Sequence, residues 1–327
     1  MDKSLDCMNN QRVFFIGVGF HEYDNYIIKH LQKKYEVCYM CSSKFYYMHP
    51  YISSLSQKYP RFIPNGNHRF TNEYIEKTRG YDFDIIFVIK GSNLTDKHLE
   101  TLKRYHPRAK WVLYLWDEWT IMQNRDVLKK HFPNIFSFDS EDCKKYGFKF
   151  RPLFYLENNQ TQEKVYDISF VGVEHSNRLK MLIEMKKMCL DNKLSYYFVI
   201  IIGLFSVVKL FFSNLSCLLN NGDIIKRKGI PYAEFLKVTR LSKVVIDIHQ
   251  KRQSGLTMRT IEALASGTKV ITTNKYIREY SNIPKDMYYV WDTNKCEEIL
   301  DFIKKPASKY TIDSYFSIEF FLQEILG

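Results

Sequence analysis

Short apolar runs, rich in β-branched and aromatic residues, recur along the whole chain and are separated by longer amphipathic stretches. Continuous apolar runs of about four to eight residues are typical of buried strands, and apolar positions three and four residues apart are typical of helices. The predicted strands are Val13–Val18, Val37–Cys41, Ile85–Ile89, Trp111–Trp116, Ile135–Phe138, Ile168–Val171, Phe198–Ile202, Val244–Ile248, Lys269–Thr273 and Met287–Trp291. The predicted helices include Thr95–Tyr105, Arg178–Leu190, Tyr232–Leu241, Leu256–Ser266 and Cys296–Lys304. This alternation predicts a doubly wound α/β fold with parallel sheets.

A division of the chain is also visible. The longest polar stretch without periodicity, Glu157–Lys164, falls near the middle. A strand, a turn and a helix follow it from Asp167 onward, as they do from Arg12 onward at the start of the chain. The sequence therefore predicts two similar domains, an N-terminal one over residues 1–158 and a C-terminal one over 159–310. Ligands of such sheets bind at the carboxyl ends of the strands, so a cleft between the domains is the expected site.

Composition and charge narrow the class of protein only in part. Of the 327 residues 45% are apolar, which excludes a disordered chain. The net charge is +12, and each half of the chain carries 24 basic and 18 acidic residues, so there is no basic tail of the kind that binds nucleic acid. This charge fits an anionic small molecule, an anionic membrane surface or nucleic acid equally well. The seven cysteines are scattered and odd in number, which favours a reducing compartment.

Two segments bear on whether the chain is directed to a membrane. Met1–Gln11 is polar and acidic and has no leader pattern. Tyr196–Leu219 is long enough to span a bilayer, but Lys209 and Asn214 interrupt it. A buried strand over Tyr197–Ile202 followed by a core helix is the favoured interpretation, and a helix in the membrane interface stays open. We expect a cytoplasmic protein, with peripheral contact to the inner face of the plasma membrane as an open alternative.

Two glycines, Gly17 and Gly19, follow the first predicted strand. A dinucleotide-binding turn also needs a small residue where Glu22 stands and an acidic residue where Ser42 stands. Both are missing, so we expect no nicotinamide and no other cofactor. His21, in the same turn, either faces the ligand cleft or starts the helix.

The segment 253–274 carries the strongest signal for chemistry. Ser254 and Gly255 are predicted to open a helix, whose free N–H groups and positive dipole end suit a phosphate. Arg259 and Glu262 lie three residues apart on this helix, and a carboxylate there accepts both hydroxyls of a ribose. A surface ion pair between Arg259 and Glu262 on an ordinary amphipathic helix is the alternative.

This segment resembles the nucleotide-sugar site of GT-B glycosyltransferases, and is most similar to the group 1 and CgeB-like enzymes of bacterial capsule and lipopolysaccharide synthesis. The resemblance extends to the segments 136–139, 152–155, 166–172 and 245–247. It implies a GT-B fold, in which two Rossmann-like domains face a cleft and a C-terminal helix, here within 311–327, crosses back to the first domain. It also implies a hexosyltransferase-like enzyme that moves a sugar from a nucleotide-diphosphate donor to a hydroxyl of a surface glycan.

The resemblance implies a role for each residue of the donor site. Glu262 resembles the glutamate that holds the donor ribose. The residues that would offer backbone N–H groups to the diphosphate are Ser254, Gly255, Leu256 and Thr257. The candidate cations that would neutralise the diphosphate as it leaves are Arg178, Arg259 and Arg252. Retaining members carry another glutamate at the position where Ser254 stands here, so the donor sugar and the stereochemical outcome stay open.

The expected reaction needs no metal ion, because the acidic pair in 82–84 precedes a predicted strand instead of following one. Arginines and a helix dipole stabilise the leaving diphosphate instead. An inverting enzyme also needs a base that deprotonates the acceptor. The candidates are His21, Asp117 or Glu118, and Asp139 or Glu141. Asp117, between Trp116 and Trp119 at the end of a predicted strand, is preferred. A capped helix start with two core tryptophans is the alternative for the Asp117 cluster.

The expected partners are therefore a nucleotide-sugar donor and a glycan or lipid-linked glycan acceptor, with no nucleic acid. Two other interpretations stay open. One is a basic binding protein for membranes or nucleic acid, and the other is a Rossmann-type enzyme that modifies sugar nucleotides.

Overall fold

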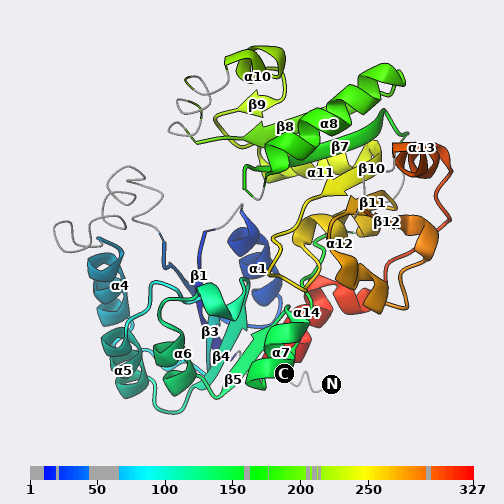
Figure 1. Ribbon diagram of the computed structural model, residues 1–327. Helices are drawn as coiled ribbons and strands as arrows, with labels where there is room; N and C mark the ends of the chain where they lie inside the picture. The colour runs from blue at the N-terminus through cyan, green and yellow to red at the C-terminus, as the bar shows by residue number, and fades with distance from the viewer. Residues whose placement is uncertain are drawn as a thin grey trace, which may run out of the picture. The chain divides into compact units, whose positions relative to one another are not determined.

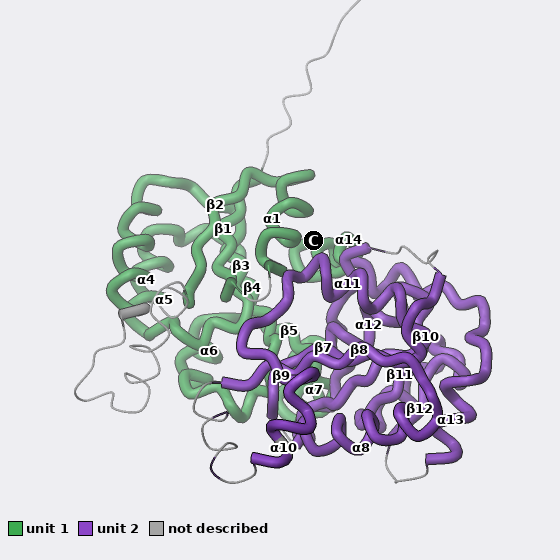
Figure 2. The backbone as a smooth tube through the Cα atoms, turned by 90° about the horizontal axis from the view of Figure 1, so that it is seen from above, with its two compact units in different colours: residues 1–151, 318–327 green, residues 152–317 purple. Residues whose placement is uncertain are grey.

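The computed structural model describes residues 11–19, 22–43, 66–157, 163–175, 177–203, 207, 212, 215–291 and 296–327. The chain divides into two compact units, and each is described by itself (Figure 2). Unit 1 comprises Met1–Arg151 and Ile318–Gly327, and unit 2 comprises Pro152–Ser317. The sequence predicts a division after residue 158, and the structure divides the chain after Arg151.

Unit 1 is built on a six-stranded parallel sheet in the order β2-β1-β3-β4-β5-β6 (Figure 1). Its strands are β1 (Arg12–Gly17), β2 (Glu36–Cys41), β3 (Ile85–Ile89), β4 (Lys110–Leu115), β5 (Asn134–Ser137) and β6 (Lys149–Phe150). Its described helices are α1 (Tyr23–Leu31), α4 (Gly66–Lys77), α5 (Asp96–Tyr105), the 3-10 helix η1 (Trp119–Ile121), α6 (Arg125–His131), α7 (Ser140–Tyr146) and α14 (Ile318–Leu326). Because β1 pairs with both β2 and β3, Ile16 lies between Met40 and Val88.

The core of unit 1 explains why its strands are apolar along their whole length. Phe14, Ile86 and Leu113 of three neighbouring strands are fully buried. They belong to one cluster with Leu99 of α5 and Leu128 of α6. A parallel sheet that is covered by helices has no solvent-facing side, so polar residues do not alternate with apolar ones.

The last helix of the chain, α14, packs within unit 1. Phe321 meets the ring of Tyr114 on β4 edge to face, with 4.7 Å between the ring centroids. Lys110 Nζ donates hydrogen bonds to the carbonyl oxygens of Leu326 at 2.9 Å and Gly327 at 2.8 Å. A cation at this end of a helix satisfies its free carbonyls and opposes the negative end of its dipole. The C-terminal residues therefore complete the first unit.

Unit 2 contains a second six-stranded parallel sheet, in the order β12-β11-β10-β7-β8-β9 (Figure 1). Its strands are β7 (Tyr166–Val173), β8 (Tyr196–Ile201), β9 (Ile225–Lys226), β10 (Ser242–Asp247), β11 (Lys269–Thr272) and β12 (Tyr288–Val290). Its described helices are α8 (Arg178–Asp191), α10 (Leu215–Asn220), α11 (Tyr232–Arg240), α12 (Met258–Ala265), α13 (Cys296–Lys304) and the 3-10 helices η2 (Lys275–Glu279), η3 (Lys285–Met287) and η4 (Ser314–Phe316). The doubly wound α/β fold predicted from the sequence is confirmed for both units.

The strand order of each sheet reverses at one point, between β1 and β3 in unit 1 and between β7 and β10 in unit 2. In open parallel sheets the connections leave in opposite directions at such a switch point, and ligands bind there, at the carboxyl ends of the strands. In unit 2 the two strand ends are Val173 and Asp247. The fold therefore marks this pair of strand ends as the first place to look for a site.

The apolar segment of unit 2 begins as a strand. β8 buries Phe198 and Ile200 within the sheet, which confirms the predicted strand. Residues 204–206, 208–211 and 213–214 of the core helix predicted after it lie outside the described residues. Within the described part of the chain, no helix is long and apolar enough to cross a bilayer.

Candidate functional site

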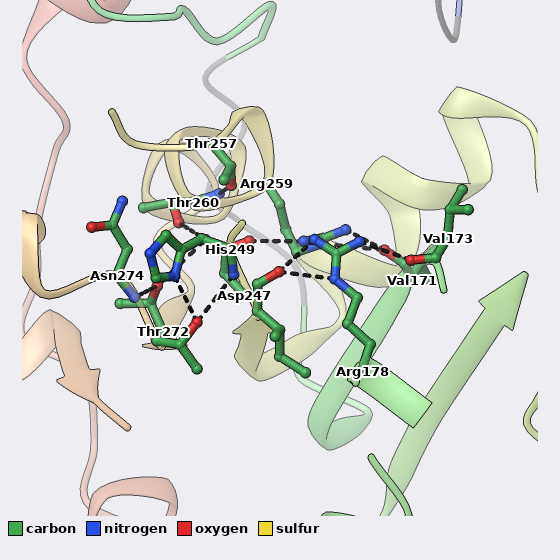
Figure 3. Close-up of polar contacts among 12 residues, drawn as sticks. Val171, Val173, Arg178, Asp247, His249, Thr257, Arg259, Thr260, Thr272 and Asn274 are labelled. Atoms are coloured by element: carbon green, nitrogen blue, oxygen red, sulfur yellow. Dashed lines mark hydrogen bonds and ion pairs between the residues drawn. The ribbon is translucent and has the colours of Figure 1, made fainter. Parts of the chain in front are cut away.

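Two guanidinium groups meet at the switch point of unit 2 (Figure 3). Arg259, in the first turn of α12, donates from Nε and Nη2 to the carbonyl oxygen of Val171, at 3.2 and 2.8 Å. Arg178, the first residue of α8, donates from Nη1 to the carbonyl oxygen of Val173 at 2.9 Å. Its Nε and Nη2 donate to the carbonyl oxygen of Ile248, with 2.9 Å for Nε. Main-chain carbonyls at the ends of β7 and β10 therefore fix the position of both arginines.

Asp247, the last residue of β10, is fully buried beside them. Its Oδ1 accepts a hydrogen bond from Arg259 Nη1 at 2.7 Å, and its Oδ2 accepts one from Thr260 Oγ1 at 2.9 Å. Burial alone would raise the pKa of Asp247, but the guanidiniums of Arg259 and Arg178 and the hydroxyl of Thr260 outweigh it and hold the pKa below its usual range. The carboxylate is therefore ionised and holds Arg259 in place.

Arg178 has no such partner. Its side chain is 6% exposed, and no carboxylate in the described part of the chain forms an ion pair with it. Burial, followed by the nearby charge of Arg259, lowers the pKa of Arg178 to about 9. The guanidinium carbon of Arg178 is 5.8 Å, and that of Arg259 is 4.9 Å, from the centroid of the Phe170 ring. Asp247 and Glu174 act on Arg178 electrostatically without forming an ion pair with it. Because its carbonyl contacts leave N–H bonds of this buried guanidinium unused, the arrangement favours binding of an anion.

The histidines near the arginines do not add positive charge at neutral pH. Burial, with further repulsion from Arg178 and Arg259, lowers the pKa of His175 to about 4. Burial also lowers the pKa of His249, whose Nδ1 lies 2.7 Å from Thr273 Oγ1. The positive charge of the site therefore comes from its two arginines and does not depend on histidine protonation near pH 7.

The loop before α12 closes the other side of the site. α12 begins at Met258, later than the sequence predicts, because Thr257 is its N-cap and accepts a hydrogen bond from the N–H of Thr260 at 3.3 Å. Asn274 Nδ2 donates to the carbonyl oxygens of Ser254 at 3.2 Å and Gly255 at 2.9 Å. These bonds fasten the loop to the end of β11. The first N–H groups of α12 follow the cap and have no partner within the helix.

The remaining residues predicted around the diphosphate lie close by in the chain but differ in exposure. Leu256 is 1% exposed and contributes to the core of the unit. Arg252 lies exposed in the turn that follows β10. Of the predicted cations, Arg178 and Arg259 lie together at the switch point.

Glu262 lies on α12 and is fully buried. Its Oε1 accepts hydrogen bonds from the Tyr232 hydroxyl at 2.6 Å and from the N–H of Leu156 at 3.2 Å. Its Oε2 is also buried and has no hydrogen-bond partner within the described residues. Burial raises the pKa of Glu262 to about 7, although both hydrogen bonds oppose this change. The alternative of a surface pair between Arg259 and Glu262 is wrong, because Arg259 pairs with Asp247.

Comparisons of the sequence find no matching family model and no matching curated protein. Solved structures nevertheless share the fold over almost the whole chain. An alpha-glucosyltransferase in complex with UDP and DNA matches with a TM-score of 0.56 and 11% identity over 96% of both chains. Anabaena HepE in complex with UDP and glucose matches with a TM-score of 0.54 and 12% identity, over 97% of this chain and 96% of that one. UDP-GlcNAc 2-epimerase from Methanocaldococcus jannaschii matches with a TM-score of 0.54 and 12% identity, over 96% of this chain and 99% of that one.

The fold is that of the GT-B class. This confirms the predicted fold class, with two units that each contain a parallel six-stranded sheet. At identities of 11 to 12% the likeness concerns the fold alone. The narrower resemblance to the CgeB-like group stays a prediction.

In unit 1 of this GT-B fold, the predicted base Asp117 follows the end of β4. Its Oδ2 lies 2.5 Å from Lys90 Nζ, and its side chain is 22% exposed. Lys90 follows β3 and has a φ of 65°, in the left-handed region that non-glycine residues rarely adopt. His21, another candidate base, lies outside the described residues. A carboxylate and an ammonium group are therefore placed together at neighbouring strand ends of unit 1.

The tryptophans beside Asp117 differ from each other. Trp119 is 3% exposed and packs edge to face on Phe148, with 5.0 Å between the ring centroids. The ring of Trp119 is therefore part of the core, as the alternative interpretation of the Asp117 cluster expects. Trp116 is half-buried, with its centroid 5.5 Å from that of Tyr23.

The glycine turn of unit 1 is filled by a side chain that the sequence did not single out. Asp24 Oδ2 accepts hydrogen bonds from the N–H of Gly19 at 2.6 Å and from the Tyr39 hydroxyl at 2.7 Å. A Cβ atom on Gly17 would lie 2.1 Å from the same oxygen. A carboxylate of the chain therefore occupies the place where such turns bind a pyrophosphate in dinucleotide-binding proteins.

One cluster in the described ranges has the geometry of a metal site: Asp96, Glu100 and His131 of α5 and α6. Lys130 reaches into it, with Nζ 2.9 Å from both carboxylate oxygens of Asp96 and 3.3 Å from an oxygen of Glu100. The ammonium group supplies the positive charge that a metal ion would bring. These helices belong to unit 1, whereas the arginines lie at the strand ends of unit 2.

Proposed function

We propose that the protein is a glycosyltransferase, which moves a sugar from a nucleoside-diphosphate sugar to a hydroxyl group of an acceptor. The observation that carries the proposal is Arg178, a buried guanidinium without a carboxylate partner in the described residues, next to Arg259 at the switch point of unit 2. An anion stabilises such a cation. Structures of this fold that contain UDP support a nucleoside diphosphate as that anion.

The two arginines act on the leaving group. As the bond to the sugar breaks, negative charge grows on the diphosphate, and donors that are already in position stabilise it most. Three of the five N–H bonds of each guanidinium are held by Val171, Val173, Ile248 or Asp247, and two remain for the ligand. The first N–H groups of α12 and its positive dipole end add to these donors. The proposed reaction therefore proceeds without a metal ion.

The nucleoside end of the donor is assigned to Glu262. Its Oε1 is occupied by donors from the chain, and Oε2 is the oxygen that accepts a ribose hydroxyl. Because Oε2 is enclosed, we propose that a neighbouring side chain moves when the nucleotide binds.

The acceptor is assigned to unit 1, with Asp117 as the base that removes its proton. The ion pair with Lys90 orients this carboxylate. We propose a surface glycan, free or linked to a lipid, as the acceptor, and a peripheral position on the inner face of the plasma membrane, which the net charge of +12 supports.

An enzyme that modifies the sugar nucleotide itself is the second candidate. The observation that favours it is the fold match to a UDP-GlcNAc 2-epimerase, which covers 96% of this chain. Asp24 in the glycine turn of unit 1 weighs against a nicotinamide-dependent version. The same donor site serves both candidates, and they differ in their product.

The experiment measures thermal stability of the protein with UDP, GDP, CMP and their sugars, because a ligand that binds only the folded state raises the melting temperature. We expect a rise with one nucleotide family, lost in Arg178→Gln and Arg259→Gln. Arg69→Gln is the matched control, since Arg69 forms an exposed ion pair with Glu73 in unit 1. NMR of the reaction mixture then separates transfer, which releases nucleoside diphosphate, from modification, which changes the sugar while it stays bonded to the nucleoside diphosphate. Equal melting temperatures with every nucleotide would contradict the proposal.

A further inference from the structure

Glu262 is held by two donors that come from different parts of unit 2. The Tyr232 hydroxyl, on the first residue of α11, lies 2.6 Å from Oε1. The N–H of Leu156, in the segment that precedes β7, lies 3.2 Å from the same oxygen. Oε2 has no partner among the described residues, and the carboxylate is fully buried. The two oxygens of this carboxylate therefore differ: Oε1 accepts two hydrogen bonds, and Oε2 accepts none from the described residues.

The surroundings of this carboxylate contain little charge that would stabilise it. Arg240 is the cation that acts on Glu262, and it is already paired with Glu157 at 2.8 Å. Glu157 opposes the negative charge, and burial opposes it most. Tyr232 is itself buried, at 4% exposed. The hydrogen bonds from Tyr232 and Leu156 thus favour an ionised Glu262.

We propose that Tyr232 is a positioning residue for Glu262: its hydroxyl fixes Oε1, so that Oε2 alone is presented to a hydroxyl of the bound nucleotide. This inference rests on the proposed function, because it concerns the same nucleotide site. The backbone N–H of Leu156 assists, and a side-chain substitution does not remove it.

Two consequences follow for binding. Without the Tyr232 hydroxyl the carboxylate has one donor instead of two on Oε1, so its orientation is less well defined and nucleotide affinity falls. The ionised form also loses a stabilising partner, so Glu262 takes up a proton at a higher pH. A protonated Glu262 carries its proton on Oε2, because Oε1 already accepts hydrogen bonds, and that oxygen then no longer accepts a ribose hydroxyl as a carboxylate does.

The test measures the dissociation constant of UDP by calorimetry between pH 6 and 9. The proteins are the wild type, Tyr232→Phe, Glu262→Gln, and Tyr197→Phe, in which a hydroxyl bonded to the exposed Glu234 at 3.3 Å is lost. UDP titrates in this range by itself, and Glu262→Gln, which cannot ionise at this position, gives that background. We expect the affinity of the wild type for UDP to decrease as the pH is lowered below about 7. Tyr232→Phe should bind UDP about fivefold more weakly at pH 7.5, and its affinity should begin to decrease at a higher pH. Tyr197→Phe should match the wild type.

A merely structural role for Tyr232 would lower thermal stability and leave the pH profile of UDP binding where it is. A Tyr232→Phe profile that coincides with the wild-type profile, in a wild type that binds UDP, would overturn this inference and leave the proposed function standing. Absence of binding of UDP, GDP and CMP to the wild type at every pH would overturn both. Tyr232→Leu provides a second variant without the hydroxyl if Tyr232→Phe does not fold.

Discussion

Gly172 offers a way to disturb the anion site without removing any charged group. It lies on β7, between the carbonyl of Val171 and the end of the strand. A Cβ atom at this position would lie 2.6 Å from Arg259 Nη2 and 2.9 Å from Cζ of Phe170. The backbone of Gly172 is not among the positive-φ glycines, so an alanine is accommodated by the main chain but not by the neighbouring side chains.

The size of the effect follows from these contacts. Arg259 Nη2 has to move by roughly 1 Å to reach an ordinary contact distance from the new Cβ atom. This movement weakens its hydrogen bond to the carbonyl of Val171 and displaces the N–H bonds that remain for the ligand. Overpacking of this kind costs about 1–3 kcal/mol of folding stability. The loss of one charge-assisted hydrogen bond to the diphosphate is worth about 1.5–3 kcal/mol. We therefore expect Gly172→Ala to bind UDP about 10- to 100-fold more weakly than the wild type.

Calorimetric titration with UDP measures this effect. Gly229→Ala is the matched control, because its new Cβ would meet Ile201 Cδ1 at an ordinary 3.6 Å within the same unit. The control is expected to retain wild-type affinity. If Gly172→Ala binds UDP within twofold of Gly229→Ala while folding normally, Arg259 does not contact the diphosphate and the site is misassigned.

Three further predictions concern the scaffold of the two units. Asp247→Ala leaves the guanidinium of Arg259 buried without its carboxylate and should cost about 3–5 kcal/mol in urea unfolding, whereas a loss below about 1 kcal/mol would contradict the ion-pair assignment. The pKa of Glu262, about 7 in the folded protein against 4.5 ordinarily, means that the folded state binds this proton more tightly, so stability falls as pH rises between these values. The free energy of unfolding of Glu262→Gln should therefore rise relative to that of the wild type by about 1–3 kcal/mol between pH 5 and pH 8. Parallel plots of unfolding free energy against pH for the two proteins would refute this. Lys110→Met removes two hydrogen bonds to the end of α14 and should speed amide exchange in that helix, while unchanged exchange at Leu326 would show that the bonds do not hold it.

The fold can be predicted from the sequence because it depends on local patterns of apolar residues. Apolar runs such as Ile85–Ile89 became buried strands at the predicted positions, and the alternation with helices gave the doubly wound fold. The start of α12 was misplaced because Ser254 and Thr257 are both good N-caps, and the bonds from Asn274 to the loop decide between them. Such bonds join residues distant in sequence and leave no periodic signal.

The hydrogen-bond partners of the candidate-site residues are harder to predict from the sequence, because they too are distant from one another in the chain. The order of strands places β7 beside β10, and this brings Arg259 to the carbonyl of Val171, 88 residues earlier in the chain. Asp247 ends a predicted strand, which is a usable signal, but its pairing with Arg259 depends on which helix passes over that strand end. The burial of Glu262 beneath Tyr232 depends likewise on the packing of α11 against α12.

The central claim is that unit 2 binds a nucleoside diphosphate at the ends of β7 and β10, and a crystal structure of the protein with UDP tests it most directly. The account predicts density for the diphosphate in contact with Arg178 and Arg259, next to the first turn of α12, and a ribose hydroxyl within hydrogen-bond distance of Glu262 Oε2. UDP bound elsewhere, with both guanidiniums still held only by the carbonyls of Val171, Val173 and Ile248 and by Asp247, would contradict it.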